Sequence, residues 1–348
     1  MKTITMSMSL GALPIFLAAG GCLERKETIR ITPAGGVTIE LQYSGEPQDF
    51  QGPDAMPSEG SGWRVEKQRK VQEDGKEEII LTSRRTFEPR EDLPTSYAAK
   101  GDPDADLAVL FPTTLRHERR DDGVYLHFRR TYAARPWAYV NYWQEQLVDE
   151  NVRTLGEKPL ETLTTEEKIT VLKAFAGFES LKELEFAQEA ARRLEPEAKP
   201  DHWMRARQAL LDSYESTDWD ATVARLTALS DEEERYRVFE EESKALSDAG
   251  FHAFVTELAA TARYGKSDVE RFSREYERAR KRWAITDAVA NHAFRIRVYL
   301  PGEVVAQNAD KIDDDGAAIW EFDGKALRDR AHELMITARL PVSGSGKP

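Results

Sequence analysis

The spacing of apolar residues changes at Pro136 and changes back near Asn291, and this double change constrains the fold more than any other feature. Outside these points apolar and polar residues alternate, as in the stretch 37–43, which is typical of half-buried strands. Between them apolar residues recur every three or four positions, as in 269–283, which is typical of an amphipathic helix. The chain is therefore predicted to run from strands to helices and back to strands.

The two strand-rich blocks are expected to form one domain. The C-terminal block, residues 293–341, holds few predicted strands, and pairing it with 28–135 would bury the apolar faces of both. We predict an α+β fold in which a discontinuous β-rich domain, made by both chain ends, carries an all-α helical insertion over 136–292. The alternative is three successive units, β, α and β. Residues 342–348 are expected to be a disordered tail.

Three capping boxes predict where helices of the insertion begin. In each box, the hydroxyl of the first residue accepts a hydrogen bond from the backbone N–H three residues later. The carboxylate of that later residue accepts one from the backbone N–H of the first. The pairs are Thr164 with Glu167, Ser230 with Glu233, and Ser267 with Glu270.

The last predicted helix has a basic outer face. Its residues are Arg271, Arg274, Glu275, Arg278, Lys281 and Arg282. Contact with anionic lipid or glycan is one interpretation. We favour a solvated helix face with acidic neighbours, because such charge runs are common on surface helices.

Residues 1–21 are predicted to be a lipoprotein signal peptide. They carry one charge, at Lys2, and end in small residues directly before Cys22, the only cysteine. Cys22 is therefore expected to be lipidated, with 22–27 as a tether to the first strand; an ordinary signal peptide or an uncleaved anchor are the alternatives. The expected location is the cell envelope, and Leu23 at the sorting position favours the outer membrane.

Composition excludes one class of partner. The chain has 62 acidic and 49 basic residues, a formal net charge of −13, and no basic stripe, which argues against nucleic-acid binding. A hydrophobic fraction of 40% with seven tryptophans is enough for a packed core.

One C-terminal stretch resembles a known family. Residues 300–309, with Pro301-Gly302 and Asn308, followed by Ile319-Trp320-Glu321-Phe322, resemble the C-terminal part of the LppM-like bacterial lipoproteins. The resemblance implies an envelope lipoprotein with a small α+β domain and binding of lipid or another envelope component. The family supplies no catalytic residue.

No catalytic or metal motif stands out. His117-Glu118 and His332-Glu333 do not continue into zinc motifs, and neither a nucleophile elbow nor a phosphate loop occurs, so we expect no metal and no cofactor. The remaining candidates are the aromatic residues that open the helical region, Trp137, Tyr139, Tyr142 and Trp143. They could form a stacking platform for sugar or lipid, but we favour an apolar seam between the β domain and the insertion.

The expected function is that of a non-enzymatic envelope lipoprotein, a binding or adaptor protein whose helical insertion presents a partner surface. A lipid- or glycan-binding protein with a groove at the β/α junction is the alternative, and a hydrolase with a carboxylate site ranks third. The expected partners are the membrane, through the lipid on Cys22, and envelope proteins, lipid or glycan.

Overall fold

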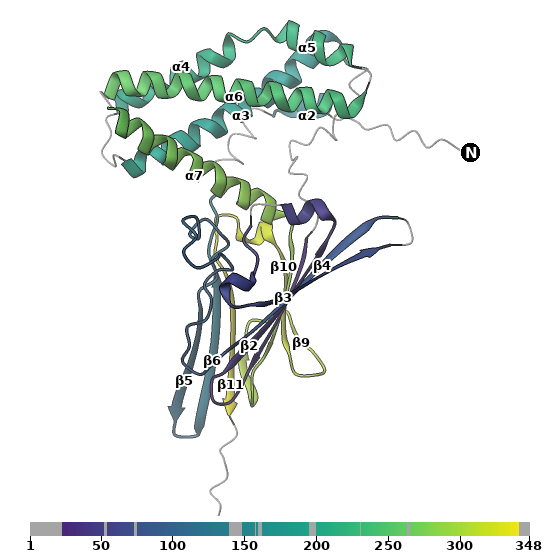
Figure 1. The fold of residues 1–348 in the computed structure, drawn as a ribbon, viewed down its shortest axis with the longest axis vertical. Helices are drawn as coiled ribbons and strands as arrows, with labels where there is room; N and C mark the ends of the chain where they lie inside the picture. Colours follow the sequence, from purple (N-terminus) through teal and green to yellow (C-terminus); the bar gives the residue numbers. More distant parts are fainter. Residues whose placement is uncertain are drawn as a thin grey trace, which may run out of the picture. The chain divides into compact units, whose positions relative to one another are not determined.

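The computed structural model describes residues 23–51, 54–72, 75–138, 148–156, 158, 162–194, 200–229, 231–262 and 265–340. Contacts divide them into a helical unit, from Trp137 to Arg280, and a β unit made of the chain before Trp137 and after Arg280 (Figure 1). The predicted α+β class, with strands from both chain ends around a helical insertion, is confirmed. The boundary on the C-terminal side lies inside a helix rather than at residue 292.

The larger sheet of the β unit has seven strands in the order β3-β4-β2-β1-β7-β10-β9. Its strands are β1 (Glu24–Ile31), β2 (Val37–Gly45), β3 (Arg64–Val71), β4 (Glu77–Phe87), β7 (Ala293–Tyr299), β9 (Lys311–Ile312) and β10 (Ala318–Asp323). The central strand β1 pairs antiparallel with β2 and parallel with β7. The centre of this sheet therefore joins the two ends of the chain.

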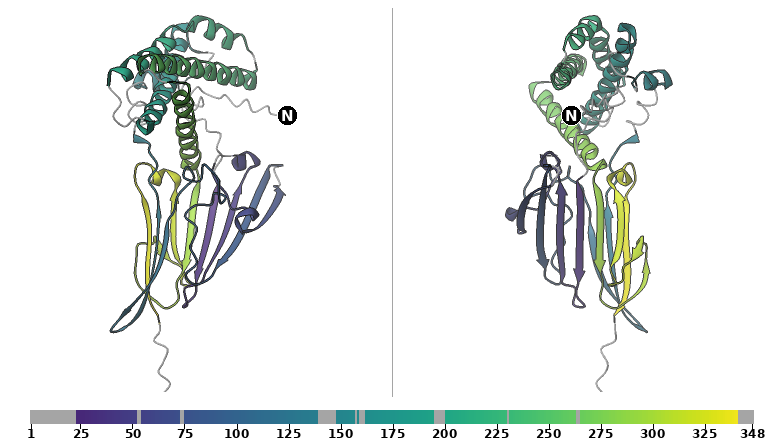
Figure 2. Two further views of the ribbon diagram at one scale, coloured as in Figure 1. Left: turned by 60° about the vertical axis from the view of Figure 1, so that its left-hand side comes forward. Right: turned by 90° about the vertical axis from the view of Figure 1, so that its right-hand side faces the viewer.

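The smaller sheet has four strands in the order β5-β6-β11-β8. They are β5 (Thr113–Arg120), β6 (Gly123–Tyr132), β8 (Glu303–Gln307) and β11 (His332–Leu340). Alternate residues of both sheets point into one shared core. Figure 2 shows the strands of the β unit in two further views. Ile29, Ile39, Phe128, Ile296 and Ile336 are among its fully buried members, as period-two patterning predicts. Short 3₁₀ helices, Pro47–Gln51, Glu59–Ser61 and Gly324–Leu327, lie in the connections.

The predicted tether over 22–27 is wrong. Strand β1 begins at Glu24, and Leu23 is already fully buried, with its carbonyl accepting a hydrogen bond from Ala293 N at 3.1 Å. The charges of Arg25 and Glu27 made this stretch look like a solvated linker. Both side chains instead point into the core, where they are 1% exposed.

The β unit has two distinct ends. At the first, which we call the connection end, β1 and β7 both begin and β6 ends at Tyr132, opposite the start of β11 at His332. Both crossings between this unit and the helical residues leave here, one after Tyr132 and one before Ala293. At the other, the turn end, lie the turns at 32–36 and 121–122 and the last residue of β11.

The helical unit contains α2 (Glu150–Gly156), α3 (Thr165–Leu194), α4 (Pro200–Glu215), α5 (Trp219–Ala228), α6 (Glu232–Ala262) and most of α7 (Lys266–Ala290). Helix α6 packs along α3 and α4. Phe251 of α6 stacks on Tyr276 of α7 with ring centroids 3.8 Å apart, and the Tyr276 hydroxyl donates to the buried Glu183 of α3. These contacts hold α3, α6 and α7 together.

One of the predicted capping boxes is confirmed. Thr164 N donates to Glu167 at 2.8 Å and Glu167 N donates to Thr164 Oγ1 at 3.2 Å. Ser230 lies outside the described residues. The box at Ser267 is wrong: α7 begins at Lys266, and Asp268 accepts from Gly265 N at 3.1 Å. In the described parts of the chain, no helix is both long and apolar enough to span a bilayer.

Candidate functional site

Of the site residues predicted from sequence, the structure describes only Trp137. Cys22, Tyr139, Tyr142 and Trp143 lie outside the described residues, so lipidation and the aromatic seam or platform stay predictions. Trp137 is 1% exposed and so presents no open ring face for a sugar.

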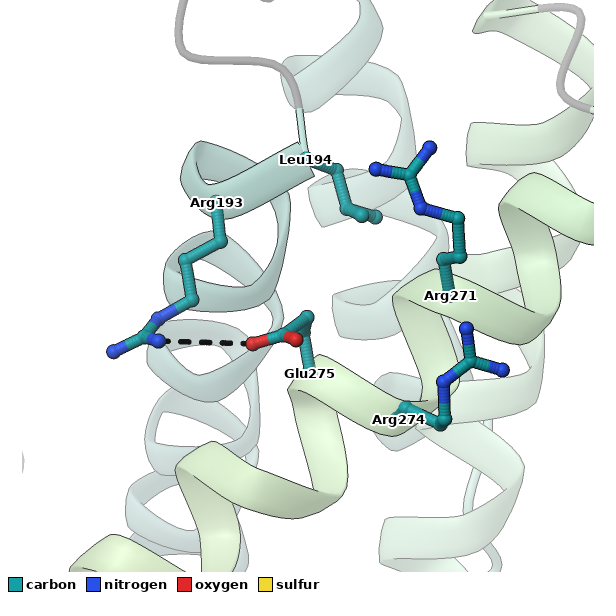
Figure 3. A pocket seen from close by; sticks show the side chains of 5 residues that line it. All are labelled: Arg193, Leu194, Arg271, Arg274 and Glu275. Atoms are coloured by element: carbon teal, nitrogen blue, oxygen red, sulfur yellow. Dashed lines mark ion pairs between the residues drawn. The ribbon is translucent and has the colours of Figure 1, made fainter. Parts of the chain in front are cut away.

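A depression on the helical unit is a better candidate site. It has a volume of about 370 Å³ and is lined by Arg193 and Leu194 at the end of α3 and by Arg271, Arg274 and Glu275 in the first half of α7 (Figure 3). This volume lies at the low end of the range for small-ligand sites. The depression therefore has room for a small anionic group.

Charge in this depression is not balanced. Its lining contains three guanidinium groups and one carboxylate, that of Glu275. Glu275 forms an ion pair with Arg193 at 3.7 Å. Arg271 has only a distant pair, 3.9 Å from Asp268, and Arg274 makes no ion pair with any residue that the structure describes. Two arginines thus offer N–H donors to a ligand.

A helix dipole stabilises the positive charge of only one of these arginines. Arg193 lies in the last turn of α3, where the C-terminal dipole stabilises a cation. Arg271 and Arg274 lie far from the C-terminus of α7, so no terminus stabilises them. All three are solvent-accessible, and a planar guanidinium donates in pairs to carboxylate or phosphate oxygens. The arrangement can therefore bind such a group.

The β unit contains a second polar cluster, which is buried between the two sheets. Arg130 of β6 forms an ion pair with Glu27 of β1, and both side chains are 0% exposed. Arg130 also donates to Thr113 Oγ1 at 2.8 Å, and the Tyr97 hydroxyl donates to Glu27 at 2.9 Å. Arg25 lies beside them, 4.9 Å from the Tyr97 ring centroid.

The surroundings of this cluster shift the pKa values of Tyr97 and Arg130. Burial, followed by the negative charge of Glu27, raises the pKa of Tyr97 well above its ordinary value, so the phenol stays protonated. Burial opposes the charge of Arg130, but Glu27, Tyr132 and Tyr97 together outweigh burial and raise the pKa of that arginine. Tyr97 and Arg130 therefore do not exchange a proton near neutral pH, and neither of the two serves as an acid or base there.

Sequence analysis missed the buried cluster and named only the α7 residues of the depression, Arg271, Arg274 and Glu275. The inward alternation of Arg25 and Glu27 with Ile29 and Ile31 is a period-two signal that could have placed the first. Arg193 lies near Arg271 only because α3 and α7 pack together, and no local sequence pattern predicts this packing. Among the described residues, no three His, Cys, Asp or Glu side chains are grouped to hold a metal ion.

Comparison with known proteins adds little to this description. No protein-family model matches the chain, and it matches no curated protein. The NMR structure of the folded domain of Mycobacterium tuberculosis LppM is similar at 10% sequence identity, covering 94% of each chain, with a TM-score of 0.28. That score is too low to establish a shared fold.

Proposed function

We propose that the chain is an envelope lipoprotein that is anchored through Cys22 and binds an anionic partner group at the arginine depression of its helical unit. The observation that carries the binding part is the excess of guanidinium groups around this depression in a chain whose net charge is −13. We propose a binding or adaptor role rather than catalysis, and the outer membrane as its location, because Leu23 follows the cysteine.

Two features support the anchor. The small residues before Cys22 follow the pattern of a lipoprotein signal. The packed body begins directly afterwards, with Leu23 buried and β1 starting at Glu24. Cleavage before Cys22 would therefore leave every described strand and helix intact.

The anchor is tested in cells by labelling with radioactive palmitate. The unmodified chain should take up label and sediment with membranes, and Cys22→Ser should do neither. Unchanged labelling of Cys22→Ser would contradict the anchor.

The binding site is tested with glycerol phosphate as the probe, at constant ionic strength. Millimolar glycerol phosphate should shift the side-chain NMR signals of Arg271 and Arg274 in the purified protein. The double variant Arg271→Gln/Arg274→Gln should lose at least tenfold in affinity, since each charge-assisted contact contributes about 1.5–3 kcal/mol. Arg207→Gln, an exposed arginine of α4, is the matched control. Equal affinity in the double variant would contradict the site.

A further inference from the structure

The start of the fold leaves very little chain between a lipid on Cys22 and the packed β unit. Only Leu23 separates Cys22 from β1, and Leu23 is fully buried. Successive Cα atoms are about 3.8 Å apart. A diacylglycerol on Cys22 must sit at the level of the lipid headgroups, so the first buried residue of the sheet must lie within a few ångströms of that level.

Strand pairing then decides which part of the β unit faces the bilayer. Leu23 lies at the connection end, where its carbonyl binds Ala293 N, the first residue of β7. The turn at 32–36 lies at the far end of β1, which has 8 residues and is therefore about 25 Å long. The two ends thus differ in depth by nearly the thickness of the hydrocarbon core of a bilayer.

One exposed apolar side chain also lies near the connection end. The most exposed large apolar side chain of the described residues is Val71, at 67%. Val71 is the last residue of β3 and pairs with Glu77 of β4. Two residues further along β4, Ile79 pairs with Gly45, which is the last residue of β2 at the connection end.

We infer that the connection end of the β unit lies against the lipid bilayer, with the turn end directed away from it. Both crossings to the helical unit leave the β unit at this end. The inference rests on the proposed lipidation of Cys22.

Two alanine positions provide a matched test. Ala331 is exposed beside the start of β11 at the connection end, and Ala34 is exposed in the turn after β1 at the turn end. Because a lipidated Cys22 has no free thiol, Ala331→Cys or Ala34→Cys supplies the only site for a fluorescent label. Each labelled, lipidated full-length protein is placed on vesicles of phosphatidylcholine and phosphatidylglycerol that carry a nitroxide on the headgroup.

The label of the Ala331→Cys variant should be quenched several-fold more strongly than that of the Ala34→Cys variant. Equal quenching, or stronger quenching of the Ala34→Cys variant, would overturn the inference. Flotation with the vesicles is measured first. A protein that does not float contradicts the anchor itself, whereas one that floats with the opposite quenching pattern keeps the anchor and loses only the orientation.

Discussion

Asn308 accepts a hydrogen bond from the indole Nε1 of Trp320 at 3.0 Å, and this bond joins the two sheets of the β unit. Trp320 belongs to β10 of the larger sheet. The same Asn308 oxygen accepts from Met335 N of β11 at 2.7 Å, and its amide nitrogen donates to the Glu333 carbonyl at 2.7 Å. One side chain thus connects β10 of the larger sheet to β11 of the smaller sheet.

Replacement of Asn308 by alanine should destabilise the protein by about 1–3 kcal/mol, because the indole N–H of the buried Trp320 loses its side-chain acceptor. Urea unfolding followed by tryptophan fluorescence measures the change. Gln68→Ala, at an exposed position of β3, is the control and should change stability by less than about 0.5 kcal/mol. A loss for Asn308→Ala no larger than the control would refute this role.

Removal of one partner of the buried Arg130–Glu27 pair should be more costly than removal of both. Glu27→Leu leaves an uncompensated guanidinium and should lower the free energy of unfolding by about 3–5 kcal/mol. The double variant Glu27→Leu/Arg130→Met should be more stable than Glu27→Leu alone. Denaturant unfolding of the unmodified protein, Glu27→Leu, Arg130→Met and the double variant decides it, and strict additivity would count against a coupled pair.

Gly324 should not tolerate a side chain. A Cβ atom at this position would lie 1.8 Å from the Val289 carbonyl oxygen at the end of α7, and backbone cannot move aside cheaply. Gly324→Ala should therefore cost about 3 kcal/mol. Gly156→Ala, where no atom lies within 4 Å, should leave the melting temperature almost unchanged. Similar melting temperatures for both variants would disprove the tight contact.

The buried His292 should make stability depend on pH. Burial lowers its pKa from the ordinary value of 6.5. The unfolded chain therefore binds this proton first as the pH falls, and stability is complete above pH 6.5 and lost as the pH falls from there towards the folded pKa. His332 contributes in the same direction.

Unfolding free energies measured between about pH 5.5 and 7.5 should therefore rise with pH, by up to about 1.4 kcal/mol for each unit of pKa shift. His292→Gln should flatten the slope, and His252→Gln, at an exposed position of α6, should not. An unchanged slope in His292→Gln would contradict a neutral buried imidazole.

Patterning alone predicted the division of the chain at Pro136 and the shared β domain, because apolar spacing reports which face of an element is buried. It failed at the start of β1, since Arg25 and Glu27 are charged and charges normally mark solvent. Their burial depends on Arg130 and Tyr97, which are distant in sequence. The same limit applies to the arginine depression: the outer face of α7 was visible in the sequence, but Arg193 joins it only in the folded bundle.

The position of β1 also sets the order in which the protein can assemble. The ribosome makes this strand first and its neighbour β2 next, but its other neighbour, β7, begins only at Ala293. At 5–20 residues per second that interval is roughly 10–50 s. Throughout it one edge of β1 exposes unpaired backbone groups that could pair with another chain. The centre of the larger sheet is thus completed last, after the helices have been synthesised.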